Sequence, residues 1–153
     1  MNGPYIISRY DLTVCSGPRQ KNLTEIESHV LKQDNSFVGV VKHIFLERSR
    51  IEEMKVDVFA INDNRKKLLW RHKVKDVCSH FAAASLIKVN FKSKKDCVVE
   101  KGEYISKMNF TQLTESFLGD SFFYGTFRYH AVSFSKKGNI FCFQINTIFT
   151  KKT

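Results

Sequence analysis

The reactive side chains of this 153-residue chain do not form a recognisable catalytic arrangement. Gly119-Asp-Ser121 resembles the start of a nucleophile elbow, but two phenylalanines follow it where that motif needs a second glycine. The chain also lacks a phosphate-binding glycine loop and a two-histidine metalloprotease motif. Its five histidines belong to separate segments, and none neighbours a nucleophile at a recognisable spacing. We therefore predict that the protein is not an enzyme and needs no cofactor.

The four cysteines are suited either to metal binding or to disulfide formation. Cys78, His80 and Cys97 would supply three metal ligands, but no residue provides a fourth at the spacing of a common zinc site. The cysteines are even in number, far apart in sequence and without a C-x-x-C pair, which favours disulfides. Composition does not choose among their three pairings. We predict two disulfides and no metal.

The start of the chain and its sequons bear on localisation. Met-Asn-Gly-Pro-Tyr lacks the basic and apolar regions of a secretion signal, so the protein is either intracellular or begins at its mature end. The four cysteines, which are suited to disulfides, and two glycosylation sequons, at Asn22 and Asn109, favour a secreted protein whose sequence begins at its mature end. We expect a secreted protein, glycosylated at both asparagines.

The chain is strongly basic, with 25 Lys and Arg against 15 Asp and Glu. A net charge of +10 attracts phosphates, anionic lipid surfaces or acidic partner proteins. The lysines occur as short scattered pairs, and basic and aromatic residues alternate only in Phe127-Arg-Tyr129. Nucleic-acid binding needs such alternation over a whole face, so it is not expected.

The hydrophobic pattern predicts an all-β protein of one domain, residues 1–153. At this length one core can bury roughly 70% of the unfolded surface. Segments of alternating or β-branched residues predict strands at 5–15, 36–46, 54–61, 68–74, 98–108, 126–134 and 140–149, with turns at 62–65 and 136–139. Residues 22–31 fit either a helix or a strand. A short helix is expected at Val77–Ile87, capped by Asp76. These elements favour a two-layer β-sandwich.

The last third of the chain resembles the ML family, the myeloid-differentiation-factor-related lipid-recognition proteins that include the ganglioside activator. The resemblance is carried by Cys97, Lys101-Gly-Glu-Tyr104, the aromatic segment 117–125, Phe127-Arg-Tyr129 and Gly138-Asn-Ile-Phe-Cys142. It is most similar to the insect, chemosensory-type branch. The resemblance implies an immunoglobulin-like sandwich, or β-cup, with an internal apolar cavity for acyl chains. It also implies an extended segment 22–31 and the disulfides Cys15–Cys142 and Cys78–Cys97.

Such a cup would be a secreted, non-enzymatic carrier of an acyl chain, glycolipid or other hydrophobic ligand. Phe117–Tyr124 would form a lid over the cavity, able to touch an anionic membrane surface during loading. The residues expected in the cavity and lid are Phe37, Val41, Phe45, Phe59, Phe117, Leu118, Phe122, Phe123, Tyr124, Phe127, Tyr129, Phe141 and Phe143. The alternative is an extracellular interaction protein that presents loops to a receptor or enzyme and has no cavity.

Overall fold

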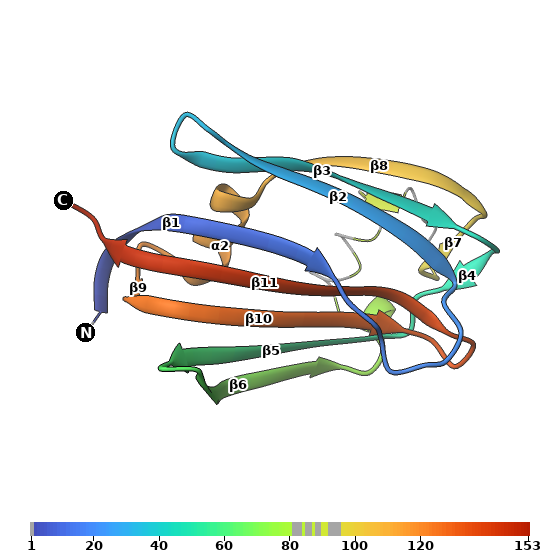
Figure 1. Ribbon diagram of the computed structural model, residues 1–153. Coiled ribbons are helices and arrows are strands. Elements are labelled where there is room, and N and C mark those ends of the chain that lie inside the picture. Colours follow the sequence, from blue (N-terminus) through green and yellow to red (C-terminus); the bar gives the residue numbers. More distant parts are fainter. Residues whose placement is uncertain (1, 81–83, 85–86, 88–89, 92–95) are drawn as a thin grey trace.

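Two antiparallel β-sheets pack face to face, as the sequence predicts (Figure 1). The computed structural model describes residues 2–80, 84, 87, 90, 91 and 96–153. The larger sheet contains, in spatial order, β6 (Arg65–Val74), β5 (Glu53–Asn62), β10 (Gly125–Phe134), β11 (Asn139–Lys151), β1 (Asn2–Val14) and β9 (Ser121–Phe123). The smaller contains β2 (Thr24–Gln33), β3 (Ser36–Phe45) and β8 (Gly102–Asn109), and a separate short ladder pairs β4 (Ser49–Arg50) with β7 (Val98–Val99). The all-β sandwich is therefore confirmed.

Two tight turns set the registers of the hairpins β2–β3 and β5–β6. Asp34 and Asn35 have φ of 50° and 65°, and Asp63 and Asn64 have φ of 48° and 65°. Consecutive residues with positive φ are typical of the two-residue hairpin turns whose twist matches the strands. The first turn places β2 beside β3 over its whole length. Residues 24–31 are thus extended, as the resemblance implies, and the helical reading of their spacing is wrong.

The helical part of the structure differs from the prediction. Of the helix predicted at Val77–Ile87, Val77–Ser79 form a 3-10 turn, η1, which the extended residue His80 follows. Ala84 and Ile87 are helical, and residues 81–83, 85 and 86 lie outside the described part of the chain. Asp76 does not cap the turn, because its carboxylate instead accepts a hydrogen bond from the Ser79 hydroxyl at 2.9 Å.

A helix that the sequence analysis missed, α2, spans Phe110–Leu118. Its N-cap is Asn109, whose side-chain oxygen accepts the Gln112 N–H at 3.0 Å. Among the described residues, no helix is long and apolar enough to cross a membrane.

The core between the sheets divides into two clusters of buried apolar side chains. Cluster 1 contains Leu23, Phe45, Ile51, Val77, Ile87, Phe91, Cys97, Val99 and Ile140. Cluster 2 contains Tyr5, Ile7, Tyr10, Phe37, Val41, Phe110, Phe122, Phe127 and Phe149. The inner face of β3 spans both, because Phe37 and Val41 belong to cluster 2 and Phe45 to cluster 1.

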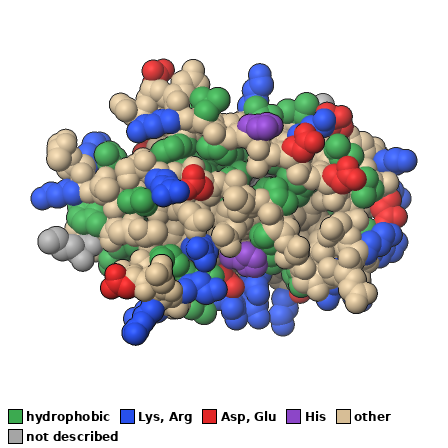
Figure 2. Space-filling model, in the orientation of Figure 1, with side chains coloured by type: hydrophobic (Ala, Val, Ile, Leu, Met, Phe, Trp, Pro, Cys, Tyr) green, Lys and Arg blue, Asp and Glu red, His purple; other side chains and the backbone are tan. Residues whose placement is uncertain are grey.

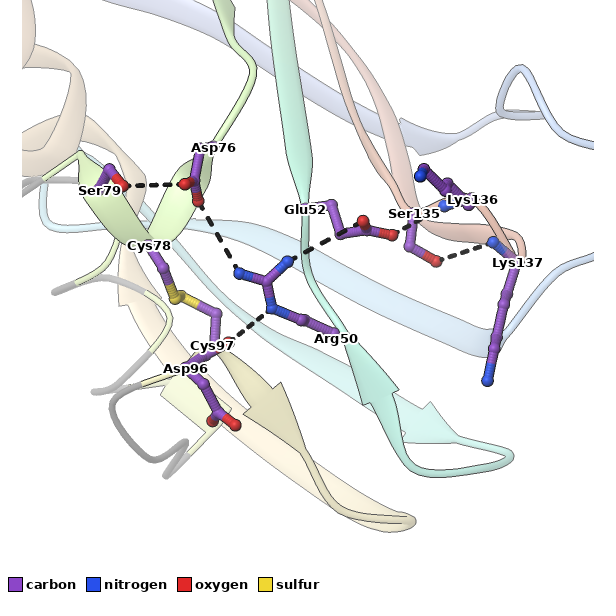
Figure 3. Close-up of polar contacts among 10 residues, drawn as sticks. All are labelled: Arg50, Glu52, Asp76, Cys78, Ser79, Asp96, Cys97, Ser135, Lys136 and Lys137. Carbon is purple, nitrogen blue, oxygen red and sulfur yellow. Dashed lines mark hydrogen bonds and ion pairs between the residues drawn. A yellow bond between two sulfur atoms is a disulfide. The ribbon is translucent and has the colours of Figure 1, made fainter.

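Polar contacts hold β4 against the turns around cluster 1 (Figure 3). The Arg50 guanidinium donates to the Asp96 carbonyl at 3.2 Å and lies 3.9 Å from Glu52 and 4.0 Å from Asp76. Glu52 in turn accepts the Lys136 N–H at 2.9 Å. Beside this network the Cys78–Cys97 disulfide closes a 19-residue loop. The two ends of that loop are therefore fixed to the sandwich.

Positive charge gathers along β6, one of the two edge strands of the larger sheet, and blue side chains cluster at the lower border of Figure 2, where this strand lies. The cations of β6 are Arg65, Lys66, Lys67, Arg71 and Lys73. Arg71 donates two hydrogen bonds, of 2.8 and 3.1 Å, to the buried carboxylate of Asp57 on β5. These hydrogen bonds hold the pKa of Asp57 below its usual value.

Candidate functional site

A cavity of about 210 Å³ lies between the two sheets, where the two core clusters meet. Its lining residues are Tyr10, Leu12, Val41, His43, Met54, Ile87, Asn90, Phe91, Ser106, Met108, Phe110, Leu113, Phe141, Phe143 and Ile145. Most of these side chains are apolar, the polar ones being His43, Asn90 and Ser106, and the described lining contains no Lys, Arg, Asp or Glu. The cavity is therefore suited to hydrocarbon rather than to a charged ligand.

The alternation of side chains along the strands forms its two main walls. Residues two apart on a strand face the same side, so Val41 and His43 of β3 line it together, as do Phe141, Phe143 and Ile145 of β11. Val41 faces Ser106 across the β3–β8 ladder. Phe110 and Leu113, three residues apart on α2, complete the lining from outside the sheets.

His43 is the most unusual side chain in this lining. It is only 5% exposed, and its ring centroid lies 4.8 Å from that of Phe91 and 6.1 Å from that of Phe143. Within the described part of the chain, neither of its ring nitrogens has a hydrogen-bond partner. Burial lowers the pKa of His43 from 6.5 to about 4, because the cation loses its hydration there. The imidazole is consequently neutral at physiological pH.

A neutral buried His43 should make folding stability depend on pH. The ring gains a proton near pH 6.5 in the unfolded chain but only near pH 4 in the folded protein. Stability is therefore complete above pH 6.5 and falls as the pH drops toward 4, by about 3 kcal/mol in total. Urea unfolding at about pH 7 and about pH 4 measures this change. Between the two pH values, the free energy of unfolding of His43→Phe should fall by about 3 kcal/mol less than that of the wild type.

The exposed His29 on β2 provides the matched control. His29→Phe should lose as much stability between the two pH values as the wild-type protein does. If His43→Phe behaves in the same way as the control, the pH dependence does not come from His43.

Three of the thirteen residues predicted for the cavity and lid lie in its lining: Val41, Phe141 and Phe143. Phe37 and Phe127 are instead buried in cluster 2, against which Tyr129 packs, and Phe45 is fully buried in cluster 1. These four side chains fill the core beside the cavity.

Phe59 was expected in the interior, but it lies on the outer face of the larger sheet. It pairs with Leu68 and Arg128 on the neighbouring strands, and its ring centroid is 4.5 Å from the Lys66 ammonium. The physical reason is strand alternation: Val58 is buried and Ala60 packs against cluster 2, so the residue between them points outward.

The predicted lid, Phe117–Tyr124, is not a loop over the cavity. Phe117 is 75% exposed at the end of α2, and Leu118 ends that helix and packs against cluster 2. Phe122 is only 9% exposed, packed on Phe127 and Phe149 at ring-centroid distances of 5.1 and 5.0 Å. None of the five predicted lid residues is in the described lining.

The aromatic segment lies away from the cavity because β9 pairs with β1. Phe122 pairs with Gly3, and the Tyr124 hydroxyl donates to the Pro4 carbonyl at 3.0 Å. Phe123, on the other face of β9, is 49% exposed. The aromatic segment therefore extends the large sheet at its edge.

Most of the lining was missed by the sequence analysis. The signal for α2 was present, since Phe110, Leu113 and Phe117 recur at helical spacing after the capping residue Asn109. Other lining residues, such as Leu12 and Met108, lie on inward faces of predicted strands. His43 carries no motif that would distinguish it from an ordinary core histidine.

The cysteines form the pairs Cys15–Cys142 and Cys78–Cys97, the two that the resemblance implies. Cys78 and Cys97 are therefore not available as thiolate ligands, which removes the metal alternative considered with His80. The His130 ring nitrogen lies 3.4 Å from the Cys142 sulfur, which is likewise part of a disulfide.

The two sequons lie in different environments. Asn22 is exposed, whereas Asn109 caps α2 and Thr111 of its sequon is buried. The Thr111 hydroxyl accepts the Phe37 N–H at 2.9 Å. Glycosylation at Asn22 and Asn109 stays a prediction.

Two larger hollows lie on the outside of the sheets. One, of about 370 Å³, is bordered by Lys55, Lys73 and Lys75, and the other, of about 400 Å³, lies over β3 and β8. Both are bordered by polar as well as apolar residues. The interior cavity is smaller but is bounded by both sheets, which makes it the better candidate for an apolar ligand.

Comparisons with known proteins find similarity only among solved structures. Chicken MD-1 complexed with lipid IVa aligns with a TM-score of 0.47 at 13% sequence identity, over 95% of this chain and 97% of that one. A Niemann-Pick type C2 protein from the Japanese carpenter ant aligns with a TM-score of 0.33 at 10% identity, over 95% and 92%. No family model and no curated protein matches the chain. At this level of similarity, ligand binding has to be argued from the cavity itself.

Proposed function

We propose that the chain is one ML-like domain, residues 1–153, that acts as a secreted, non-enzymatic lipid-binding protein. The observation that supports this function most strongly is the apolar cavity between the sheets. A hydrophobic ligand placed there would leave water for a lining whose described residues include no charged side chain. The two disulfides agree with an oxidising, extracellular or lumenal location.

The size of the cavity limits what it can enclose. An apolar protein cavity of about 150 Å³ binds benzene, so the 210 Å³ here corresponds to about eight carbon atoms. Burying eight methylene groups contributes about 6 kcal/mol before ordering costs. Without those costs this would correspond to a dissociation constant between about 1 mM and about 1 μM, so the ordering costs place actual binding at the weak side of this range or beyond it. The cavity therefore fits the end of one acyl chain, and a whole lipid would leave its headgroup outside.

Binding can be tested on the purified protein without knowing its natural ligand. The protein is extracted with organic solvent, refolded and titrated with a fluorescent fatty-acid analogue. We expect saturable binding that unlabelled fatty acid displaces, and hydrophobic adducts in native mass spectra of the protein before extraction. Absence of both the adducts and the saturable binding would contradict the proposal.

The finer expectations about partners and source stay predictions. An anionic membrane surface or a receptor would first meet the exposed side chains of Phe117 and Phe123. The alternative of an interaction protein without a ligand predicts a filled interior, so the cavity favours a carrier. The chemosensory role, like the choice among acyl chain, glycolipid and other hydrophobic ligands, stays a prediction.

A further inference from the structure

His43 leaves hydrogen-bonding capacity unused at the edge of the cavity. The side chain lines the cavity and is only 5% exposed. Neither of its ring nitrogens has a hydrogen-bond partner among the described residues. Buried polar groups in proteins nearly always have a partner, so one without any needs an explanation. The cavity is where such a partner can be accommodated, because His43 is part of its lining. The neighbours of the imidazole whose rings are in contact with it, Phe45, Phe91 and Phe143, offer no hydrogen-bonding group.

The surroundings decide what kind of partner this is. A carboxylate would be buried beside a neutral imidazole, in a lining whose described residues include no cation, at a large desolvation cost. A hydroxyl group avoids that cost and can both donate and accept a hydrogen bond. The lining has two further polar side chains, Asn90 and Ser106, and Ser106 lies on the strand that pairs with that of His43.

We propose that His43 selects hydrophobic ligands that carry an uncharged hydroxyl group, by forming a hydrogen bond to that group inside the cavity. This inference rests on the proposed lipid-binding function and names the class of ligand within it. Such a ligand has one hydroxyl on an otherwise hydrocarbon body, in the manner of an aliphatic alcohol or a phenol. Pure hydrocarbons of the same shape leave the imidazole without a partner and so bind less favourably than their size allows.

Two ligands of almost equal shape separate this hydrogen bond from hydrophobic burial. 4-Ethylphenol and 4-ethyltoluene differ by a hydroxyl in place of a methyl group, and both are of a size that suits the cavity. Their dissociation constants are measured by protein-observed NMR with the wild type and with His43→Phe, which keeps an aromatic ring but cannot make the hydrogen bond. Comparing the ratio of the two constants between the two proteins cancels the difference in ligand hydration, because that difference is the same for both proteins.

We expect the ratio to shift about ten-fold against the phenol in His43→Phe, as for the loss of one buried hydrogen bond. His43→Leu is a second variant for the case that the phenylalanine packs poorly, and it should shift the ratio by the same factor. His29→Phe, at an exposed position, is the control and should leave the ratio unchanged. If both ligands bind and the ratio is the same in all four proteins, the inference is overturned while the proposed function stands. If neither ligand nor the fatty-acid analogue binds the wild type, both are overturned.

Discussion

Replacing Cys15 and Cys142 with alanine is expected to lower the free energy of unfolding by about 5 kcal/mol. This disulfide joins residues 127 apart, so in the chain-entropy model it restricts the unfolded chain more than a short cross-link does. It also closes the end of β1 on β11, where the Cys15 N–H donates to the Cys142 carbonyl at 3.0 Å. Without the disulfide, only the backbone pairing of β1 with β11, which runs to Val14 and Phe143, and this hydrogen bond would connect the end of β1 to β11.

Urea unfolding followed by circular dichroism measures this effect, with the Cys78→Ala, Cys97→Ala variant as the matched comparison. That disulfide spans 19 residues, for which the same model gives about 3 kcal/mol. The long-range disulfide should therefore be the more costly one to remove. An equal or reversed order would mean that strain or residual structure, and not loop length, governs the two contributions.

Ile145→Trp is expected to abolish most ligand binding. Ile145 lines the cavity on β11, and an indole at this position would take the room of about five methylene groups. At about 0.8 kcal/mol for each methylene group, binding weakens by about 4 kcal/mol, or roughly a thousand-fold. The displacement titration with the fluorescent fatty-acid analogue measures the loss, and circular dichroism checks that the variant is folded.

Ile148→Trp is the matched control for this substitution. Ile148 lies three residues further along β11 and faces the other side of the sheet, opposite Arg9 and Thr126. The same exchange there should leave ligand affinity within about three-fold of the wild type, because surface substitutions rarely change packing in the interior. If both tryptophan variants bind as the wild type does, the ligand lies outside this cavity.

The strands could be predicted because their signals are local. Segment 36–46 is rich in branched and aromatic residues on both faces, as in a buried strand, and Asn62–Arg65 is a turn sequence. Segment 22–31 was ambiguous because Leu23, Ile26 and Val30 fit helical spacing, while Ile26 and Val30 also fit one face of a strand. The turn at Asp34 and Asn35, read together with it, would have favoured the hairpin that the structure contains.

The site was less predictable because contacts distant in sequence determine it. Phe122 is buried because β9 pairs with the first residues of the chain, about 120 positions earlier. Phe59 points outward because it shares a strand face with Lys55 and Asp57, and this alternation was already present in the sequence when Phe59 was expected in the interior. His43 becomes a candidate only when the empty space beside it is known.

The basic strand at the border of the large sheet has a further consequence for the molecule in solution. β6 is the last strand in the sheet order, and its five cations are accompanied by no acidic residue. A second molecule that aligned its own β6 there would bring like charges together along the whole contact, which opposes strand addition. Besides attracting anions, this charge should discourage self-association through the sheet edge and so help to prevent aggregation.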